Sequence, residues 1–93
     1  MTDIWPQGTY RNDLGELVIG GVSVVDLVQQ HGSPLYLYDE ATLRDAMRTW
    51  KRLLESRLPG SRVVYAGKAF LCTAIAAMVA EEGLGLDCVS DGE

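Results

Sequence analysis

From residue 34 onward, short β-prone runs alternate with longer helix-like segments. The β-prone runs occupy residues 34–38 (PLYLY), 62–66 (RVVYA) and 86–89 (LDCV), and the first two are typical of strands buried on both faces of a sheet. Between them, residues 40–58 repeat apolar side chains at spacings of three and four, and residues 73–82 are alanine-rich, so both are predicted helices. Short connections in this order favour right-handed crossovers. The pattern therefore predicts an α/β fold with a parallel sheet.

The first third of the chain is more polar and less regular. Residues 1–15 read as an extended leader, and the β-prone run at 16–19, closed by two glycines, predicts an edge strand or hairpin arm. Ser23 is a suitable first residue for a short helix at about 23–31, and Gly32 supplies its stop.

Three parallel strands leave two open edges and cannot cover both faces of their sheet. A closed (β/α)₈ barrel usually needs ~250 residues, and this chain has 93. We therefore expect the N-terminal piece of a larger fold, with an uncovered apolar stripe on the helix at 40–58. That stripe comprises Leu43, Ala46, Met47, Trp50, Leu53, Leu54 and Leu58.

Composition narrows the possible partners. Eight basic against thirteen acidic residues give a net charge of −5, and the scattered Arg and Lys form no basic stripe, so nucleic acid is not an expected partner. No apolar run approaches the ~20 residues of a membrane span, and the N-terminus lacks the order of a secretory signal. Cys72, Cys88 and His31 are too few for a Cys/His metal site. We expect a cytoplasmic protein with reduced thiols.

Of the two lysines, Lys68 is the candidate for chemistry. Lys51 falls in the middle of the amphipathic helix, where a solvated side chain is expected, whereas Lys68 follows the run at 62–66, at the carboxyl end of a predicted strand. Parallel α/β sheets place their ligands at that end. A lysine amine can form a Schiff base with an aldehyde, which makes pyridoxal phosphate a candidate ligand. The alternative is a lysine that only extends into solvent.

Three blocks of sequence resemble a known family. They are residues 19–44 (IGGVSVVDLVQQHGSPLYLYDEATLR), 63–70 (VVYAGKAF) and 81–93 (EEGLGLDCVSDGE). In order and spacing they resemble the N-terminal part of the diaminopimelate decarboxylase family, pyridoxal-phosphate-dependent decarboxylases of the alanine-racemase-like barrel group. The resemblance runs from about Leu17 to Glu93.

The resemblance implies roles for four residues. Lys68 matches the family's Schiff-base lysine, and Ala66 lies where its strand passes the cofactor ring. Asp87 matches an acidic residue beside the cofactor at the end of the following strand, although from the residues alone a loop carboxylate that accepts backbone hydrogen bonds is an equal interpretation. Glu93 falls on a second acidic position close to the lysine.

The resemblance also implies a fold and a domain division. Residues 33–93 would be the first βα units of a (β/α)₈ TIM-like barrel that is incomplete in this chain. Residues 1–32 would form a leader, strand and short helix, with residues 9–20 as a strand that pairs with a C-terminal β domain. The cofactor-stacking His, the acid on the pyridine nitrogen, the Gly-rich phosphate site and the second-subunit residues of the family lie outside this sequence.

The implied reaction is decarboxylation of meso-2,6-diaminopimelate to L-lysine, in lysine biosynthesis, by an enzyme that is a homodimer at full length. Three alternatives stay open. The protein is a decarboxylase of the ornithine or arginine type, a non-catalytic barrel that binds pyridoxal phosphate, or an inactive remnant.

Overall fold

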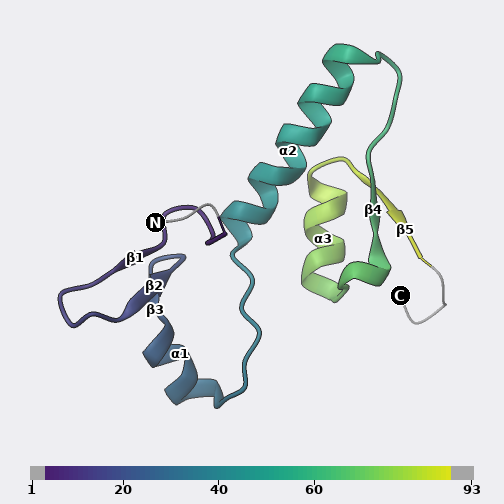
Figure 1. The fold of residues 1–93 in the computed structure, drawn as a ribbon. Coiled ribbons are helices and arrows are strands. Elements are labelled where there is room, and N and C mark those ends of the chain that lie inside the picture. Colours follow the sequence, from purple (N-terminus) through teal and green to yellow (C-terminus); the bar gives the residue numbers. More distant parts are fainter. Residues whose placement is uncertain (1–3, 89–93) are drawn as a thin grey trace. The chain divides into compact units, whose positions relative to one another are not determined.

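The computed structural model describes residues 4–88, and the chain divides into two compact units, residues 1–43 and 44–93. The elements are β1 (Tyr10–Arg11), β2 (Leu17–Ile19), β3 (Val22–Ser23), α1 (Val24–His31), α2 (Glu40–Arg57), β4 (Val64–Ala66), the 3₁₀ helix η1 (Gly67–Ala69), α3 (Thr73–Glu81) and β5 (Gly85–Asp87) (Figure 1). No helix within residues 4–88 is long and apolar enough to cross a membrane.

The first unit contains a three-stranded antiparallel sheet in the order β1-β2-β3. Val18 of β2 pairs with Tyr10 on one side and Ser23 on the other, and its side chain is buried. Asn12 shapes the first turn, because its Oδ1 accepts the backbone N–H groups of Leu14 and Glu16 at 3.0 and 2.9 Å. The predicted hairpin arm at 16–19 is therefore confirmed.

The expected single strand over residues 9–20 is wrong. The turn after β1 divides this stretch, and its two halves, β1 and β2, pair with each other (Figure 1). A glycine and an Asx-turn asparagine in the middle of the stretch favour this reversal, since both residue types suit tight turns.

Helix α1 has the predicted limits. Ser23 occupies the N-cap position in extended conformation, but its hydroxyl donates to Glu16 Oε1 at 3.1 Å and makes no capping bond. At the other end Gly32, with φ 82°, donates its N–H to the carbonyl of Val28 at 2.7 Å. This left-handed φ explains why glycine suits the stop.

The predicted buried strand at 34–38 is wrong. The segment is irregular, and Tyr36 is 89% exposed. Apolar and aromatic content indicates that a segment can line a pleated surface, but a strand also needs a neighbour to complete its backbone hydrogen bonds. Within the described part of the chain, no strand pairs with residues 34–38.

Helix α2 begins as predicted, with Asp39 as its cap. The Oδ2 atom of Asp39 accepts the backbone N–H of Thr42 at 3.1 Å and also the Thr42 hydroxyl. The apolar stripe is only partly covered: Met47 is 7% exposed, whereas Trp50 is 66% exposed. The expectation of an uncovered stripe is therefore confirmed at Trp50 and wrong at Met47.

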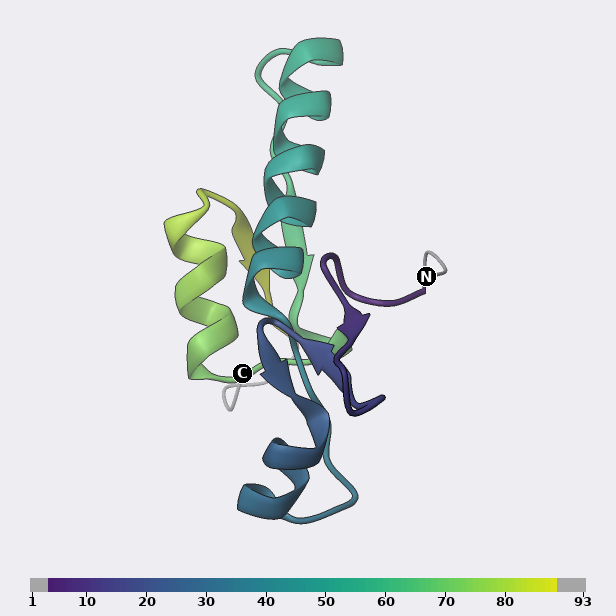
Figure 2. The same ribbon diagram turned by 90° about the vertical axis from the view of Figure 1, so that its left-hand side faces the viewer.

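The second unit is built around a parallel strand pair. β4 and β5 pair with Val64 opposite Gly85, Tyr65 opposite Leu86 and Ala66 opposite Asp87. Helix α3 connects them and packs against β5 (Figure 1 and Figure 2). Gly83, with φ 78°, ends the helix region, and the core side chains of this unit are Met47, Ile75, Met78 and Val79.

Compared with the prediction, β4 and β5 are in place but shorter, and β4 is not buried on both faces. Val64 is exposed, because the described residues cover the strand pair with little besides α3. The parallel β–α–β arrangement places this unit in the α/β class, as expected. Within the described residues, its sheet consists of β4 and β5.

Candidate functional site

Lys68 lies where β4 ends. The strand stops at Ala66, and the chain turns directly into η1, whose middle residue is Lys68. The Gly67 residue is buried, whereas Lys68 and Ala69 are exposed. The turn is thus packed at its glycine and presents the lysine side chain to solvent.

Asp87 and Ala66 lie at the same end of the sheet. Asp87 is the last residue of β5 and is the register partner of Ala66. Neighbouring strands in a sheet lie about 4.8 Å apart, so the carboxylate-bearing residue is one strand away from the residue that precedes the Lys68 turn. The structure therefore brings three of the four expected site residues to one edge, and the fourth, Glu93, lies outside the described residues.

A hydrogen bond from Tyr65 closes the Lys68 turn. The Tyr65 hydroxyl donates to the backbone carbonyl of Phe70, so the bond spans the residues on either side of η1. Sequence reasoning did not single out Tyr65. The signal that could have indicated it is its position, since Tyr65 lies three residues before the candidate site lysine, Lys68.

Helices α2 and α3 are joined by ion pairs away from Lys68. Arg44 bonds to Glu81 at 2.6 Å and to Glu82 at 2.8 Å, and Arg48 bonds to both Glu82 oxygens at 2.7 and 2.9 Å. Hydrogen bonds from Arg48 and then from Arg44 lower the pKa of Glu82 to about 2. The same pairing raises the pKa of Arg48.

The expectation that Lys51 is only solvated is wrong. Lys51 is half-buried, and its Nζ lies 3.4 Å from the backbone oxygen of Glu82. A polar helix face acquires partners only when another element packs beside it, which helical periodicity does not report.

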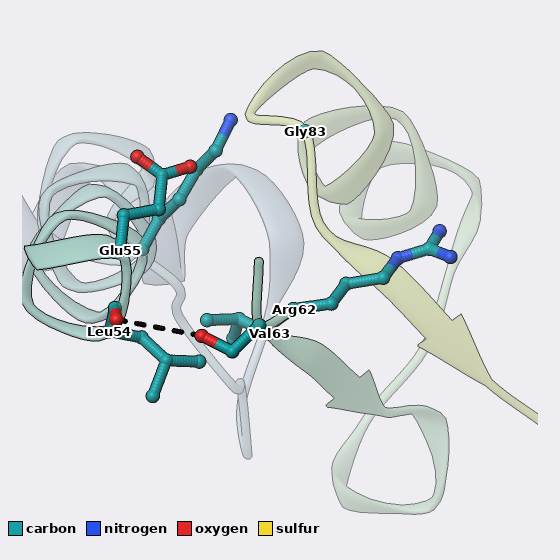
Figure 3. A pocket seen from close by; sticks show the side chains of 7 residues that line it. Leu54, Glu55, Arg62, Val63 and Gly83 are labelled. Atoms are coloured by element: carbon teal, nitrogen blue, oxygen red, sulfur yellow. Dashed lines mark hydrogen bonds between the residues drawn. The ribbon is translucent and has the colours of Figure 1, made fainter. Parts of the chain in front are cut away.

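A shallow pocket of about 70 Å³ lies at the opposite, amino-terminal end of the strand pair. Figure 3 shows Leu54 and Glu55 on α2, and Arg62 extending from the chain before β4 across the chain that follows Gly83, at the start of β5. The pocket does not include Lys68, so it is separate from the candidate site. Its lining residues are Lys51, Leu54, Glu55, Ser61, Arg62, Val63 and Gly83.

Cys72 and Cys88 are free, exposed thiols. Cys72 is the residue before α3, and Cys88 follows β5. Across residues 4–88, His, Cys, Asp and Glu side chains form no cluster of three that could hold a metal ion.

The groups at the carboxyl edge fit pyridoxal phosphate. Its aldehyde requires a primary amine that solvent and ligand can reach, and Lys68 supplies one. Ala66 has a small side chain that leaves room beside the strand end, and Asp87 adds a carboxylate on the neighbouring strand. The sequence has neither the GxxxxGK[ST] motif nor the GxGxxG motif, the two glycine-rich patterns that bind phosphate groups.

The parallel strands β4 and β5, helix α3 and the exposed Lys68 together form an α/β unit with an accessible lysine at its carboxyl edge. A family model matches this part of the chain. Residues 40–93 match the model described as the pyridoxal binding domain of pyridoxal-dependent decarboxylases, and the chain belongs to this family. The match begins at α2 and includes Lys68, Ala66 and Asp87.

Curated relatives are more specific. The chain is 53% identical over 92 residues to a diaminopimelate decarboxylase of Synechocystis. This alignment covers 98% of the chain and 20% of the relative. It is 44% identical over 87 residues to a diaminopimelate decarboxylase of Bacillus subtilis, and 38% identical over 91 residues to one of Mycobacterium tuberculosis. These alignments cover 92% and 98% of the chain and 20% of each relative. The chain thus spans about a fifth of the length of these relatives.

Proposed function

We propose that the protein is a pyridoxal-phosphate-dependent decarboxylase that converts meso-2,6-diaminopimelate to L-lysine. The observation that carries this proposal is the position of Lys68, an exposed amine at the carboxyl end of β4. The strong similarity of almost the whole chain to diaminopimelate decarboxylases supports the choice of substrate.

In this proposal Lys68 holds the cofactor covalently through its Nζ. When bound, pyridoxal phosphate accepts the electron pair that remains when carbon dioxide leaves the substrate. Ala66 leaves space for the cofactor ring beside the strand end, and Asp87 contributes negative charge one strand away.

Glu93, which lies outside the described residues, is the second acidic residue of the proposed set. We further propose that the β4–α3–β5 unit is the start of a (β/α)₈ barrel, with its remaining strands outside this sequence. The proposed enzyme is a cytoplasmic homodimer that acts on a small amino acid, without nucleic acid or membrane partners.

The test is to incubate the full-length protein with pyridoxal phosphate, reduce it with borohydride and map pyridoxyl-lysine by peptide mass analysis. Labelling of Lys68 and not Lys51 is the expected result. Labelling of both lysines alike, or of neither, would contradict the assigned site.

The substrate is tested separately, by carbon dioxide release from diaminopimelate, ornithine and arginine. Diaminopimelate is expected to react at least tenfold faster than the other two. Preference for ornithine or arginine would move the protein to that branch of the decarboxylases. Labelled Lys68 without release from any of the three would indicate a binding protein without catalysis.

A further inference from the structure

We propose that Tyr65 is a positioning residue for Lys68, an inference that rests on the proposed function. The proposal is based on one contact: the Tyr65 hydroxyl donates to the carbonyl of Phe70 and so joins the two ends of the segment that carries the lysine. Tyr65 therefore acts through the backbone of the turn and does not need to touch the cofactor.

The turn needs such a tether because its own structure is minimal. η1 is one turn of 3₁₀ helix, and this geometry makes few and poorly aligned hydrogen bonds. It is followed by extended backbone at Phe70, whose φ and ψ are 178° and 132°, before α3 begins at Thr73. The Tyr65 bond links this segment back to the sheet and so restricts the positions that the lysine can sample at the strand end.

The other end of the tether is well fixed. Tyr65 is the central residue of β4 and is paired with Leu86 of β5. Its side chain is half-buried, unlike those of Val64 and Ala66, its neighbours in the strand. The hydrogen bond from this hydroxyl thus fixes the Phe70 carbonyl, two residues beyond Lys68, relative to the strand pair. A reaction at the lysine amine benefits from this because catalysis is sensitive to small misplacements of a reacting group.

Tyr65→Phe tests the proposal, because it removes the hydroxyl and keeps the ring. Tyr36→Phe is the matched control, since Tyr36 is 89% exposed and lies in the first unit. Both variants are made in the full-length protein. For each we would measure the rate of pyridoxyl trapping at Lys68, the affinity for pyridoxal phosphate, kcat and KM for diaminopimelate, and the melting temperature without cofactor.

The expected result for Tyr65→Phe is trapping and kcat lowered about three- to tenfold, with KM changed less than twofold and the melting temperature close to that of Tyr36→Phe. A Tyr65→Phe protein that matches the control in trapping and kcat would overturn the proposal. So would a loss of trapping that only follows a lower melting temperature, because the hydroxyl would then be purely structural. A wild-type protein that is not labelled at Lys68 would instead refute the proposed function itself.

Discussion

The two ends of the second unit use charged residues in opposite ways. At the carboxyl edge of β4 and β5, Lys68 and Asp87 are exposed, and neither has a resolved ion pair among the described residues. At the junction of α2 and α3, Glu82 is only 9% exposed and bonds to two arginines.

The difference separates chemistry from architecture. A charged group that is fully paired stabilises the arrangement of its elements, but its lone pairs and protons are already engaged. An exposed lysine contributes little to folding and remains available to react. Substitutions at the carboxyl edge should therefore alter activity without stability, and substitutions in the ion-pair cluster should do the reverse.

The largest effect is expected for Lys68→Ala. Covalent attachment of pyridoxal phosphate should be abolished and decarboxylation should fall at least a thousandfold, because no other group supplies the amine. The melting temperature without cofactor should be unchanged, since the side chain is exposed. Absorbance of the bound cofactor and carbon dioxide release measure the first effect.

Lys51→Arg is the control for that experiment, because it replaces the other lysine and keeps its charge. This variant should retain attachment and activity. If borohydride still fixed the cofactor to the Lys68→Ala protein, Lys68 would not be the residue that binds it, and the proposed reactive role of the carboxyl edge would be wrong.

A smaller effect is expected for Asp87→Asn. The substitution removes the charge beside Ala66 and keeps the size, so we expect kcat to fall about tenfold with an unchanged melting temperature. Steady-state kinetics with diaminopimelate measure the change. Full activity together with a lower melting temperature would mean that Asp87 is a loop carboxylate with a structural role.

The helices were predictable from the sequence because their signals are local. Asp39 caps α2 by bonding to Thr42, the third residue of the helix, and Gly32 ends α1 with a left-handed φ. Each of these interactions joins residues within one turn, so residue type and spacing are sufficient to predict it.

The irregular segment at 34–38 and the ion pairs were not predictable in the same way. Residues 34–38 have a strand-like composition, yet the described chain places no partner beside them. Arg44 and Glu82 are 38 positions apart, and nothing in their separate helical patterns indicates that they meet. The position of Lys68 after a strand was predictable from the β-prone run that precedes it, whereas the Tyr65 hydrogen bond depends on the shape of a turn that the sequence pattern does not specify.

Glu82→Gln should lower stability and leave catalysis intact. At neutral pH we expect the melting temperature to fall by several degrees, because both arginines lose the charge that they bond. The pKa of Glu82 is about 2 in the folded protein and 4.5 without these partners, so its contribution is complete above about pH 4.5. It is lost as the pH falls from there to about 2.

The pH series gives the sharper test, because wild type and Glu82→Gln differ only in the group at position 82. The difference in melting temperature between wild type and Glu82→Gln should be constant at neutral pH and shrink below about pH 4.5. A difference that persists unchanged at about pH 2 would show that the amide disturbs packing and that the charge itself is unimportant.

Glu81→Gln should have the smallest effect, although it alters the neighbouring residue of the same cluster. The Glu81 side chain is 60% exposed, and within the cluster it bonds only to Arg44. In the Glu81→Gln variant, Arg44 would still be bonded to Glu82. Exposed ion pairs contribute about 0.5 kcal/mol, so the melting temperature of the larger, full-length protein should fall by less than about 2 °C. Thermal unfolding of Glu81→Gln and Glu82→Gln under identical conditions compares the two losses in melting temperature. Equal losses would mean that burial does not distinguish the two carboxylates and that the cluster acts only through its total charge.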